Sequence, residues 1–357
     1  MNGSRPTPSP VHLVVPGPIE TLTGGFIYDR NIADFLRLTG RLGELVCLEG
    51  NYPRPNTAAL ENANKSLAKL PQGDPLVIDG LALTALLEHS TTLTRYPRTL
   101  ALIHHPLCDE TGLSLSEADR IFQAERQALK RVSGCVVTSS TTGRRLMDFG
   151  ISSDRIRVVI PGLERVATGR PSTNDGAIRL LCVATLTPRK GQDILLAALA
   201  DLRDLDWRLD LVGAPRDADF ANKVKSMVGT LDLDDRVHFH GEVARERLAT
   251  YYAKAGLFVL PSYHEGFGMA LTEAMSHGLA IISTHVGAIP ETVPAAAGEL
   301  IAPGDAPTLA VSLRRFITDT ATRTHAGIAA RQAADRLPGW AETGAAFLAA
   351  VDNLSLN

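Results

Sequence analysis

Several features that would mark other kinds of protein are scarce in this chain of 357 residues. No window approaches the roughly 20 apolar residues of a membrane-spanning helix, and residues 1–10 lack the basic and apolar stretches of a signal peptide. The 4 cysteines have neither CxxC nor zinc-ligand spacing, so reduced thiols are expected. These absences predict a cytoplasmic protein.

Neither positive nor negative charge predominates in the chain. The net charge of -3 leaves no electrostatic footprint for nucleic acid, so no nucleic-acid partner is expected. Five basic residues could meet anionic lipid at the inner face of a membrane, although acidic neighbours favour a solvated helical face instead. They are Arg126, Lys130, Arg131, Arg144 and Arg145.

Two kinds of site are missing as well. The turn at residues 16–25, after the first apolar run, has no Gly-x-Gly-x-x-Gly, which argues against a nicotinamide oxidoreductase. Five histidines in the second half of the chain match no metal-ligand spacing, so no metal site is expected. They are His238, His240, His264, His277 and His285.

Short apolar runs alternate with helical patterns along both halves of the chain, which predicts parallel sheets with crossover helices. The expected strands lie at 11–15, 45–48, 75–79, 100–104, 135–138, 157–162, 179–184, 207–213, 237–241, 257–260 and 280–283. The clearest helical patterns lie at 28–42, 115–132, 192–202, 244–255 and 268–277. The sequence therefore predicts two α/β domains.

The best linker candidate is the segment 165–177, which is rich in Thr, Gly, Pro, Ser, Asn and Asp. It places the domains at residues 1–165 and 166–339.

The strongest motif runs from Pro261 to Val293. A loop after an apolar strand carries Glu265, and a helix is expected to begin near Gly268 or Met269. The free backbone N–H groups of such a helix make an anion site. Glu273 lies about one turn further on, so two carboxylates can flank one ligand.

This stretch, with Glu265 and Glu273 in an Glu-Gly-Phe-Gly…Glu-Ala-Met context, resembles the family 4 retaining glycosyltransferases. The resemblance implies the GT-B fold, in which two Rossmann-like domains with parallel sheets face each other across a donor-binding cleft. It implies that Glu265 contacts the donor sugar and Glu273 the ribose of the nucleotide. Amides of the intervening turn would hold the diphosphate and sugar, at Gly266, Phe267, Gly268, Met269 and Ala270.

A second motif follows the strand at 179–184, where Arg189 and Lys190 precede a helix. Two cations at a helix start suit a phosphate. The motif resembles the family's Arg-x4-Lys-Gly element, in which both cations hold the diphosphate. Lys190 matches, but Thr185 stands where the family has arginine. Either Arg189 supplies the second charge, or Thr185 makes a neutral contact.

Two further matches lie in the first half. Gly24 and Gly25 form a Gly-Gly turn, which in the family reaches the donor and otherwise is an ordinary turn. His104 ends an apolar strand, where a parallel sheet faces its ligand crevice. The resemblance implies that His104 contacts the transferred sugar, with His105 as the second choice.

The remaining matches concern the base and the chain end. Gly213, Phe239, Gly241 and Val243 lie where the family binds the base. The resemblance also implies that a last helix, within residues 340–357, packs back onto the first domain.

The resemblance implies a metal-independent, cofactor-free enzyme that moves a sugar from a nucleoside-diphosphate sugar to an acceptor hydroxyl with retention. The sugar, the acceptor and the choice among uridine, guanosine and adenosine stay open. The alternatives are a GT-B phosphorylase or epimerase and a non-catalytic homologue that binds sugar nucleotides.

Overall fold

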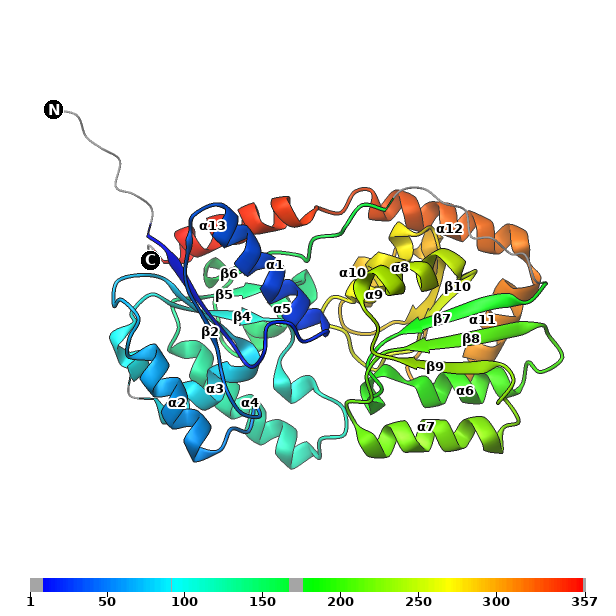
Figure 1. Ribbon diagram of the computed structural model, residues 1–357, viewed down its shortest axis with the longest axis horizontal. Coiled ribbons are helices and arrows are strands. Elements are labelled where there is room, and N and C mark those ends of the chain that lie inside the picture. Colours follow the sequence, from blue (N-terminus) through cyan, green and yellow to red (C-terminus); the bar gives the residue numbers. More distant parts are fainter. Residues whose placement is uncertain (1–8, 91, 167–175, 356–357) are drawn as a thin grey trace. The chain divides into compact units, whose positions relative to one another are not determined.

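The computed structural model describes residues 9–90, 92–166 and 176–355 (Figure 1). The chain divides into two units. The first comprises Met1–Asp109, Leu113–Gly162 and Pro338–Asn357, and the second comprises Glu110–Gly112 and Leu163–Leu337. Most of the expected linker, 165–177, lies outside the described residues.

The first unit is built on a six-stranded parallel sheet with the order β2-β1-β3-β4-β5-β6. Its strands are β1 (Val11–Val15), β2 (Leu42–Cys47), β3 (Leu76–Asp79), β4 (Thr99–Ile103), β5 (Gly134–Val137) and β6 (Ile156–Val158). Its helices are α1 (Gly24–Leu38), α2 (Thr57–Leu67), α3 (Gly80–His89), α4 (Leu115–Lys130), α5 (Ser140–Asp148) and α13 (Trp340–Leu354), with short 3-10 turns at Thr92–Arg95, Leu107–Asp109 and Ser153–Arg155.

Helices cover both faces of this sheet, which is why its strands are apolar runs rather than alternating patterns. Successive strand residues point to opposite faces. Leu13 and Val77 pack with α1 and α13, whereas Val14 and Ile78 pack with α2 and α3.

The last helix, α13, packs on the first unit against α1. A Cβ atom on Gly344 would lie 2.1 Å from the ring of Phe35, so only glycine permits this close approach. Asp352 pairs with Arg41 at 2.7 Å, and the ring of Trp340 lies 6.0 Å from that of Tyr28. The chain therefore returns to complete the core of its first unit.

The second unit has a parallel sheet with the order β12-β11-β10-β7-β8-β9. Its strands are β7 (Ile178–Val183), β8 (Trp207–Val212), β9 (Val237–Gly241), β10 (Leu257–Leu260), β11 (Ala280–Thr284) and β12 (Gly298–Ile301). Its helices are α6 (Gln192–Ala200), α7 (Ala218–Thr230), α8 (Arg245–Lys254), α9 (Met269–Ser276), α10 (Ile289–Thr292), α11 (Ala306–Thr318) and α12 (Thr320–Ala334), with 3-10 turns at Pro188–Lys190 and Ala295–Ala297. The two parallel sheets confirm the predicted α/β class.

Strand order reverses at one place in each sheet, between β1 and β3 in the first and between β7 and β10 in the second. Open parallel sheets bind ligands beyond the carboxyl ends of the strands at such a reversal. In each unit, several of the expected site residues follow these strands.

Two expectations about elements were wrong. The first helix begins at Gly24 rather than near residue 28, and it ends at Leu38 because Gly40 turns the chain with φ 67° before β2 begins. Strand β12 was not expected, because its four residues include a glycine and a glutamate and form no apolar run.

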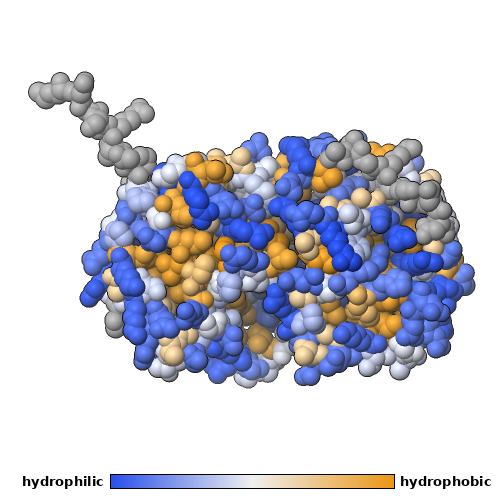
Figure 2. Space-filling view, in the orientation of Figure 1, coloured by the Kyte–Doolittle hydropathy of each residue, from blue (hydrophilic) through white to orange (hydrophobic). Residues whose placement is uncertain are grey.

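On the face drawn in Figure 2, hydrophobic residues are interspersed with hydrophilic ones. Within the described residues, no helix combines the length and the apolarity needed to cross a bilayer. The expected basic group is partly engaged inside the first unit, since Arg145 pairs with Asp109 at 2.8 Å and Arg131 bonds the carbonyl of Leu87. All 4 cysteines are free, and Cys47 is exposed whereas Cys108, Cys135 and Cys182 are buried.

Candidate functional site

In the first unit, three titratable residues meet at the carboxyl end of the sheet. His104 follows β4, Asp79 ends β3, and Asp29 lies on α1. The Nε2 atom of His104 lies 3.2 Å from Oδ1 of Asp29 and 3.1 Å from Oδ2 of Asp79. The imidazole is 20% exposed while the carboxylates are 1% and 5% exposed. His104 is therefore the part of this cluster that a ligand can reach.

The charges of this cluster are strongly coupled. Burial alone would favour the neutral ring, but the carboxylates of Asp29 and Asp79 outweigh it and raise the pKa of His104 to about 10. Burial and the neighbouring Asp79 raise the pKa of Asp29 to about 7. Oδ2 of Asp29 is buried without a hydrogen-bond partner in the described structure. The imidazole is thus held as a cation between two acids.

The same three residues could hold a metal ion, because one ligand atom from each lies within 4.8 Å of the others. No other such group occurs among the described residues, so none includes His238, His240, His264, His277 or His285. Sequence reasoning missed Asp29 and Asp79. The position of Asp79 at the end of an apolar strand was a usable signal.

The Gly-Gly turn reaches this cluster. Gly24 and Gly25 form the first turn of α1, whose N-cap Thr23 makes no side-chain capping bond. A Cβ atom on Gly25 would lie 3.2 Å from Cδ2 of His104. The structure therefore brings two of the expected site residues together, with the backbone of Gly25 against the imidazole.

In the second unit, the carboxylate of Glu265 is buried beside two cations. Nζ of Lys190 lies 2.6 Å from its Oε1, and the hydroxyl of Ser262 donates to the same oxygen at 2.7 Å. Nη1 of Arg189 is 3.9 Å from Oε2. Burial would raise the pKa of Glu265, but Lys190 and Arg189 lower it to about 2. Burial lowers the pKa of Lys190.

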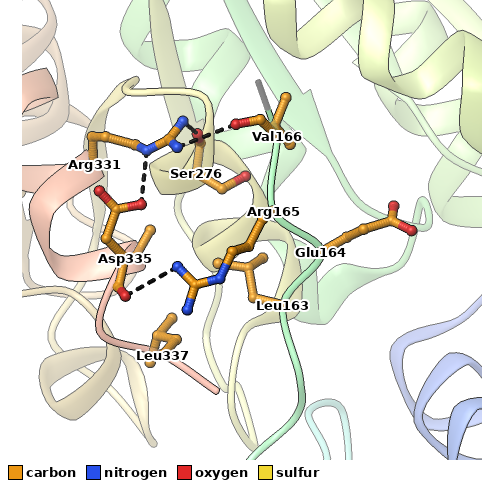
Figure 3. Close-up of a pocket in the computed structure, with 9 residues that line it drawn as sticks. Leu163, Glu164, Arg165, Val166, Ser276, Arg331, Asp335 and Leu337 are labelled. Atoms are coloured by element: carbon orange, nitrogen blue, oxygen red, sulfur yellow. Dashed lines mark hydrogen bonds and ion pairs between the residues drawn. The ribbon is translucent and has the colours of Figure 1, made fainter. Parts of the chain in front are cut away.

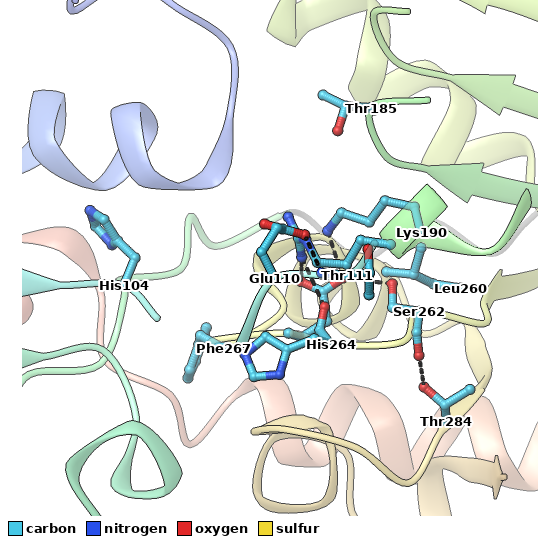
Figure 4. Close-up of polar contacts among 12 residues, drawn as sticks. His104, Glu110, Thr111, Thr185, Lys190, Leu260, Ser262, His264, Phe267 and Thr284 are labelled. Atoms are coloured by element: carbon cyan, nitrogen blue, oxygen red, sulfur yellow. Dashed lines mark hydrogen bonds and ion pairs between the residues drawn. The ribbon is translucent and has the colours of Figure 1, made fainter. Parts of the chain in front are cut away.

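Arg189 is held mainly by partners other than Glu265. Its Nε lies 2.9 Å from Oε1 of Glu110, and its Nη1 donates to the carbonyl of His264 at 2.8 Å. Figure 4 shows Thr185 apart from this cluster, and its carbonyl accepts a bond from Gln192. Lys190 is therefore the closer cation to Glu265, and Arg189 also fixes the loop.

Glycine shapes the turn that carries these residues. Gly191 has φ 68°, and a Cβ atom there would lie 2.2 Å from the carbonyl oxygen of Pro261. The loop after β7 can thus lie directly on the loop after β10. Gly266, Phe267 and Gly268 follow in that second loop, which is tied down by a 2.8 Å bond from Thr292 to the carbonyl of Phe267.

Helix α9 begins at Met269, after Gly268 with φ 91° and no side-chain cap. Its first N–H groups, including those of Met269 and Ala270, could bind an anion there, which stays a prediction. Glu273 lies one turn further, and its Oε2 accepts a 2.9 Å bond from the hydroxyl of Tyr252 on α8. Sequence reasoning missed Tyr252.

The residues expected near the base lie at the ends of β8 and β9. Gly213 follows β8, and its amide donates to the carbonyl of Gly241 at 2.8 Å. Phe239 lies in β9, and Val243 two residues after it ends. Nearby, Nε2 of His240 lies 2.6 Å from Asp210. The structure thus groups all four on neighbouring strand ends.

A small hollow elsewhere in the second unit contains none of these residues (Figure 3). Arg331 lines it, donating to the carbonyls of Ser276 and Val166 and pairing with Asp335 at 3.0 Å. None of the expected site residues lines it, so it is not the candidate site.

The sequence of the chain is similar to those of known glycosyltransferases. Residues 169–333 match the sequence profile described as glycosyl transferases group 1. The D-inositol 3-phosphate glycosyltransferase of Kineococcus radiotolerans is 29% identical over 283 residues, which cover 69% of this chain and 65% of that protein. The MMP alpha-(1->4)-mannosyltransferase of Mycolicibacterium hassiacum is 26% identical over 315 residues, with 84% and 75% covered. The chain thus spans slightly less than two thirds of the first of these relatives.

Solved structures share the architecture. Sucrose-phosphate synthase from Thermosynechococcus elongatus superposes with a TM-score of 0.80 at 23% identity, covering 96% of this chain and 98% of that one. Anabaena HepE in complex with UDP and glucose superposes with a TM-score of 0.77 at 17% identity, covering 96% and 99%. At these identities the likeness concerns the fold, and it confirms the expected GT-B architecture.

Proposed function

We propose that the chain, whose residues 169–333 match the glycosyl transferases group 1 profile, is a retaining glycosyltransferase. It would move a sugar from a nucleoside-diphosphate sugar to an acceptor hydroxyl. The observation that carries the proposal is the arrangement of Lys190 and Glu265 beside the amino end of α9, because it combines cations, a carboxylate and free N–H groups in one place.

The reaction breaks the bond between the anomeric carbon and the leaving phosphate oxygen. Negative charge grows on the diphosphate and positive charge on the sugar. Lys190, Arg189 and the first amides of α9 would stabilise the leaving diphosphate in this low-dielectric setting. Glu265 would orient the sugar hydroxyls, and its ionised state, with pKa about 2, suits an acceptor of hydrogen bonds.

Retention requires the new bond to form on the face that the phosphate leaves. In the proposed step the acceptor oxygen attacks the anomeric carbon on that face, and the departing phosphate oxygen takes the acceptor proton. His104 is assigned a contact with the transferred sugar, which its partly exposed, cationic imidazole can make as a donor.

The donor is proposed to be a UDP- or GDP-sugar, and UDP is the nucleotide in the HepE complex. The acceptor would be a saccharide, a lipid or a small molecule. No metal is needed to hold the diphosphate in this scheme, because Lys190 and the helix end supply the positive charge.

One observation favours a second candidate function, a homologue that binds sugar nucleotides without turning them over. Thr185 replaces a family cation, and Arg189 is already engaged by Glu110. Release of the nucleoside diphosphate from its sugar would exclude this reading, whereas binding without release would support it. Phosphorolysis with free phosphate, or conversion of the donor alone to an epimer, would instead indicate a phosphorylase or an epimerase.

The first experiment is calorimetric titration with UDP, GDP and ADP in the presence of EDTA. At least one nucleotide should bind, and a hundredfold excess over its Kd should stabilise the fold by about 2.7 kcal/mol. Failure of all three to bind, with or without metal, would remove the proposal. Binding that depends on added metal would remove only its metal-independent part.

A further inference from the structure

Glu273 is expected to meet the ribose, but a glutamate side chain has three rotatable bonds. Fixing such a side chain costs rotamer entropy. A site that holds the carboxylate before the ligand arrives avoids that cost at binding. The structure shows what could hold it.

Tyr252 on α8 contacts Glu273 directly. Its hydroxyl lies 2.9 Å from Oε2 of Glu273 and 3.4 Å from the carbonyl of Ala270. A phenol has one proton to donate, and it donates to the carboxylate, because that hydrogen bond is the shorter one and is charge-assisted. Within the described residues, the hydrogen bonds to this carboxylate end on Oε2. Oε1 is therefore the oxygen left for a ligand.

The tyrosine is itself immobilised. Its side chain is fully buried, and two rings lie nearly parallel to it. The ring of His277 is 5.1 Å away at 20°, and the ring of Phe258 is 6.0 Å away at 30°. Burial also raises the pKa of Tyr252 well above its usual value, so the hydroxyl keeps its proton and stays a donor. A fixed donor thus meets a flexible acceptor.

We propose that Tyr252 is the positioning residue for Glu273: its hydroxyl fixes one carboxylate oxygen so that the other accepts a ribose hydroxyl of the nucleotide. The inference rests on the proposed function, because it requires a nucleotide in the site. Tyr252 touches neither the sugar nor the reacting atoms in this scheme, so it acts through Glu273 alone.

The test uses Tyr252→Phe, which keeps the stacked ring and removes the hydroxyl. Whichever of UDP, GDP and ADP binds the wild type most tightly is titrated calorimetrically beside its 2′-deoxy and 3′-deoxy forms. The wild type should bind at least one deoxy form about tenfold more weakly than the parent nucleotide. Tyr252→Phe should bind the parent about tenfold more weakly and should lose most of this ribose discrimination.

Tyr96→Phe is the matched control. It also removes a buried hydroxyl, which donates to the carbonyl of Leu67 at 2.5 Å, but it lies in the first unit. It should leave all the affinities unchanged at a comparable loss of thermal stability. Glu273→Ala with and without Tyr252→Phe completes a double-mutant cycle. The second change should add little to the first if the two residues act together.

Unchanged ribose discrimination in folded Tyr252→Phe, or additive losses in the cycle, would overturn the inference and leave the proposed function standing. If Tyr252→Phe does not fold, Glu273→Asp replaces it, because it withdraws the carboxylate from the hydroxyl by one methylene. Full discrimination in Glu273→Asp would likewise overturn the inference. A wild type that binds no nucleotide would instead overturn the proposed function itself.

Discussion

The two units carry buried charge clusters of opposite balance at equivalent places in similar sheets. In the first, one imidazole stands between two carboxylates, and the pKa values of His104 and Asp29 are raised to about 10 and about 7. In the second, one carboxylate stands beside two cations, and the pKa of Glu265 is lowered to about 2. Each cluster lies at the carboxyl ends of strands at or next to the point where strand order reverses.

In the proposed reaction, Lys190, Arg189 and the amino end of α9 would stabilise a leaving diphosphate. The acids of the first cluster would suit sugar hydroxyls and growing positive charge. Both sheets thus have a charged cluster near the reversal of strand order, and the side chains there determine the sign of its charge.

The largest expected effect is that of Lys190→Ala, which would remove the nearer cation of the second cluster. Turnover should fall at least about 100-fold, as when one preorganised electrostatic contact is lost. Stability should fall by about 3–5 kcal/mol, because Glu265 stays buried with a weaker partner. Steady-state kinetics and urea unfolding measure the two effects.

Arg189→Ala should cost less, because that side chain is shared with Glu110. Arg314→Ala, which breaks the exposed pair with Asp204, should change neither quantity by much. A dispensable Lys190 with a dominant Arg189 would reverse the assignment of the two cations.

The next effect separates the two glutamates. Glu273→Ala should raise the Kd of the nucleoside diphosphate by about 1.5–3 kcal/mol with little change in kcat, because ribose contacts persist in the transition state. Glu265→Ala should mainly lower kcat, because its contact with the sugar strengthens as charge develops. Equal loss of nucleotide binding in both variants would abolish this division of roles.

The clusters should also give the units opposite responses to pH. Glu265 has a lowered pKa, so its stabilisation is complete above about pH 4.5 and is lost as pH falls toward 2. His104 has a raised pKa, so its stabilisation is complete below about pH 6.5 and is lost as pH rises through 10. The raised pKa of Asp29 weakens the first unit further as pH rises from about 4 to about 7.

The chain has 2 tryptophans, and each unit contains one, Trp207 in the second and Trp340 in the first. Urea unfolding of Trp340→Phe, followed by fluorescence of Trp207, should show acid lability that Glu265→Gln flattens. Trp207→Phe should show alkaline lability that His104→Gln flattens. The same pH profile for both reporters would contradict the contrast between the clusters.

The smallest expected effect is that of Gly25→Ala. The new Cβ would lie 3.2 Å from His104, which must shift by a few tenths of an ångström. Turnover should fall roughly tenfold, because misplacement of a positioned group slows the reaction. Gly143→Ala, whose Cβ would meet its neighbours at 3.5 Å, is the control and should leave turnover unchanged.

Much of this architecture could be predicted from the sequence. Apolar runs identified eleven of the strands, because parallel strands buried on both faces are continuously hydrophobic. Strand β12 was not predicted, because Gly298 and Glu299 interrupt its hydrophobic pattern. Local turn chemistry likewise pointed to the start of α9 at Met269.

Only part of the candidate site could be predicted from the sequence. Lys190 and Glu265 each stood out through local motifs, but their direct contact joins residues 75 positions apart. Asp29 and Tyr252 had no motif of their own, since each matters only through the residue that it meets in the folded chain. Tertiary pairing of this kind leaves no periodic signal in a single sequence.

The most direct test of the central claim is to identify the anomer first released when the protein slowly hydrolyses a donor. UDP-α-glucose, UDP-α-galactose and GDP-α-mannose would be followed by proton NMR before the free sugar mutarotates, with EDTA present and Lys190→Ala as the control. The account predicts early appearance of the α-anomer from at least one donor, with little release by the variant. The β-anomer appearing first, or no turnover of any donor that binds, would contradict it.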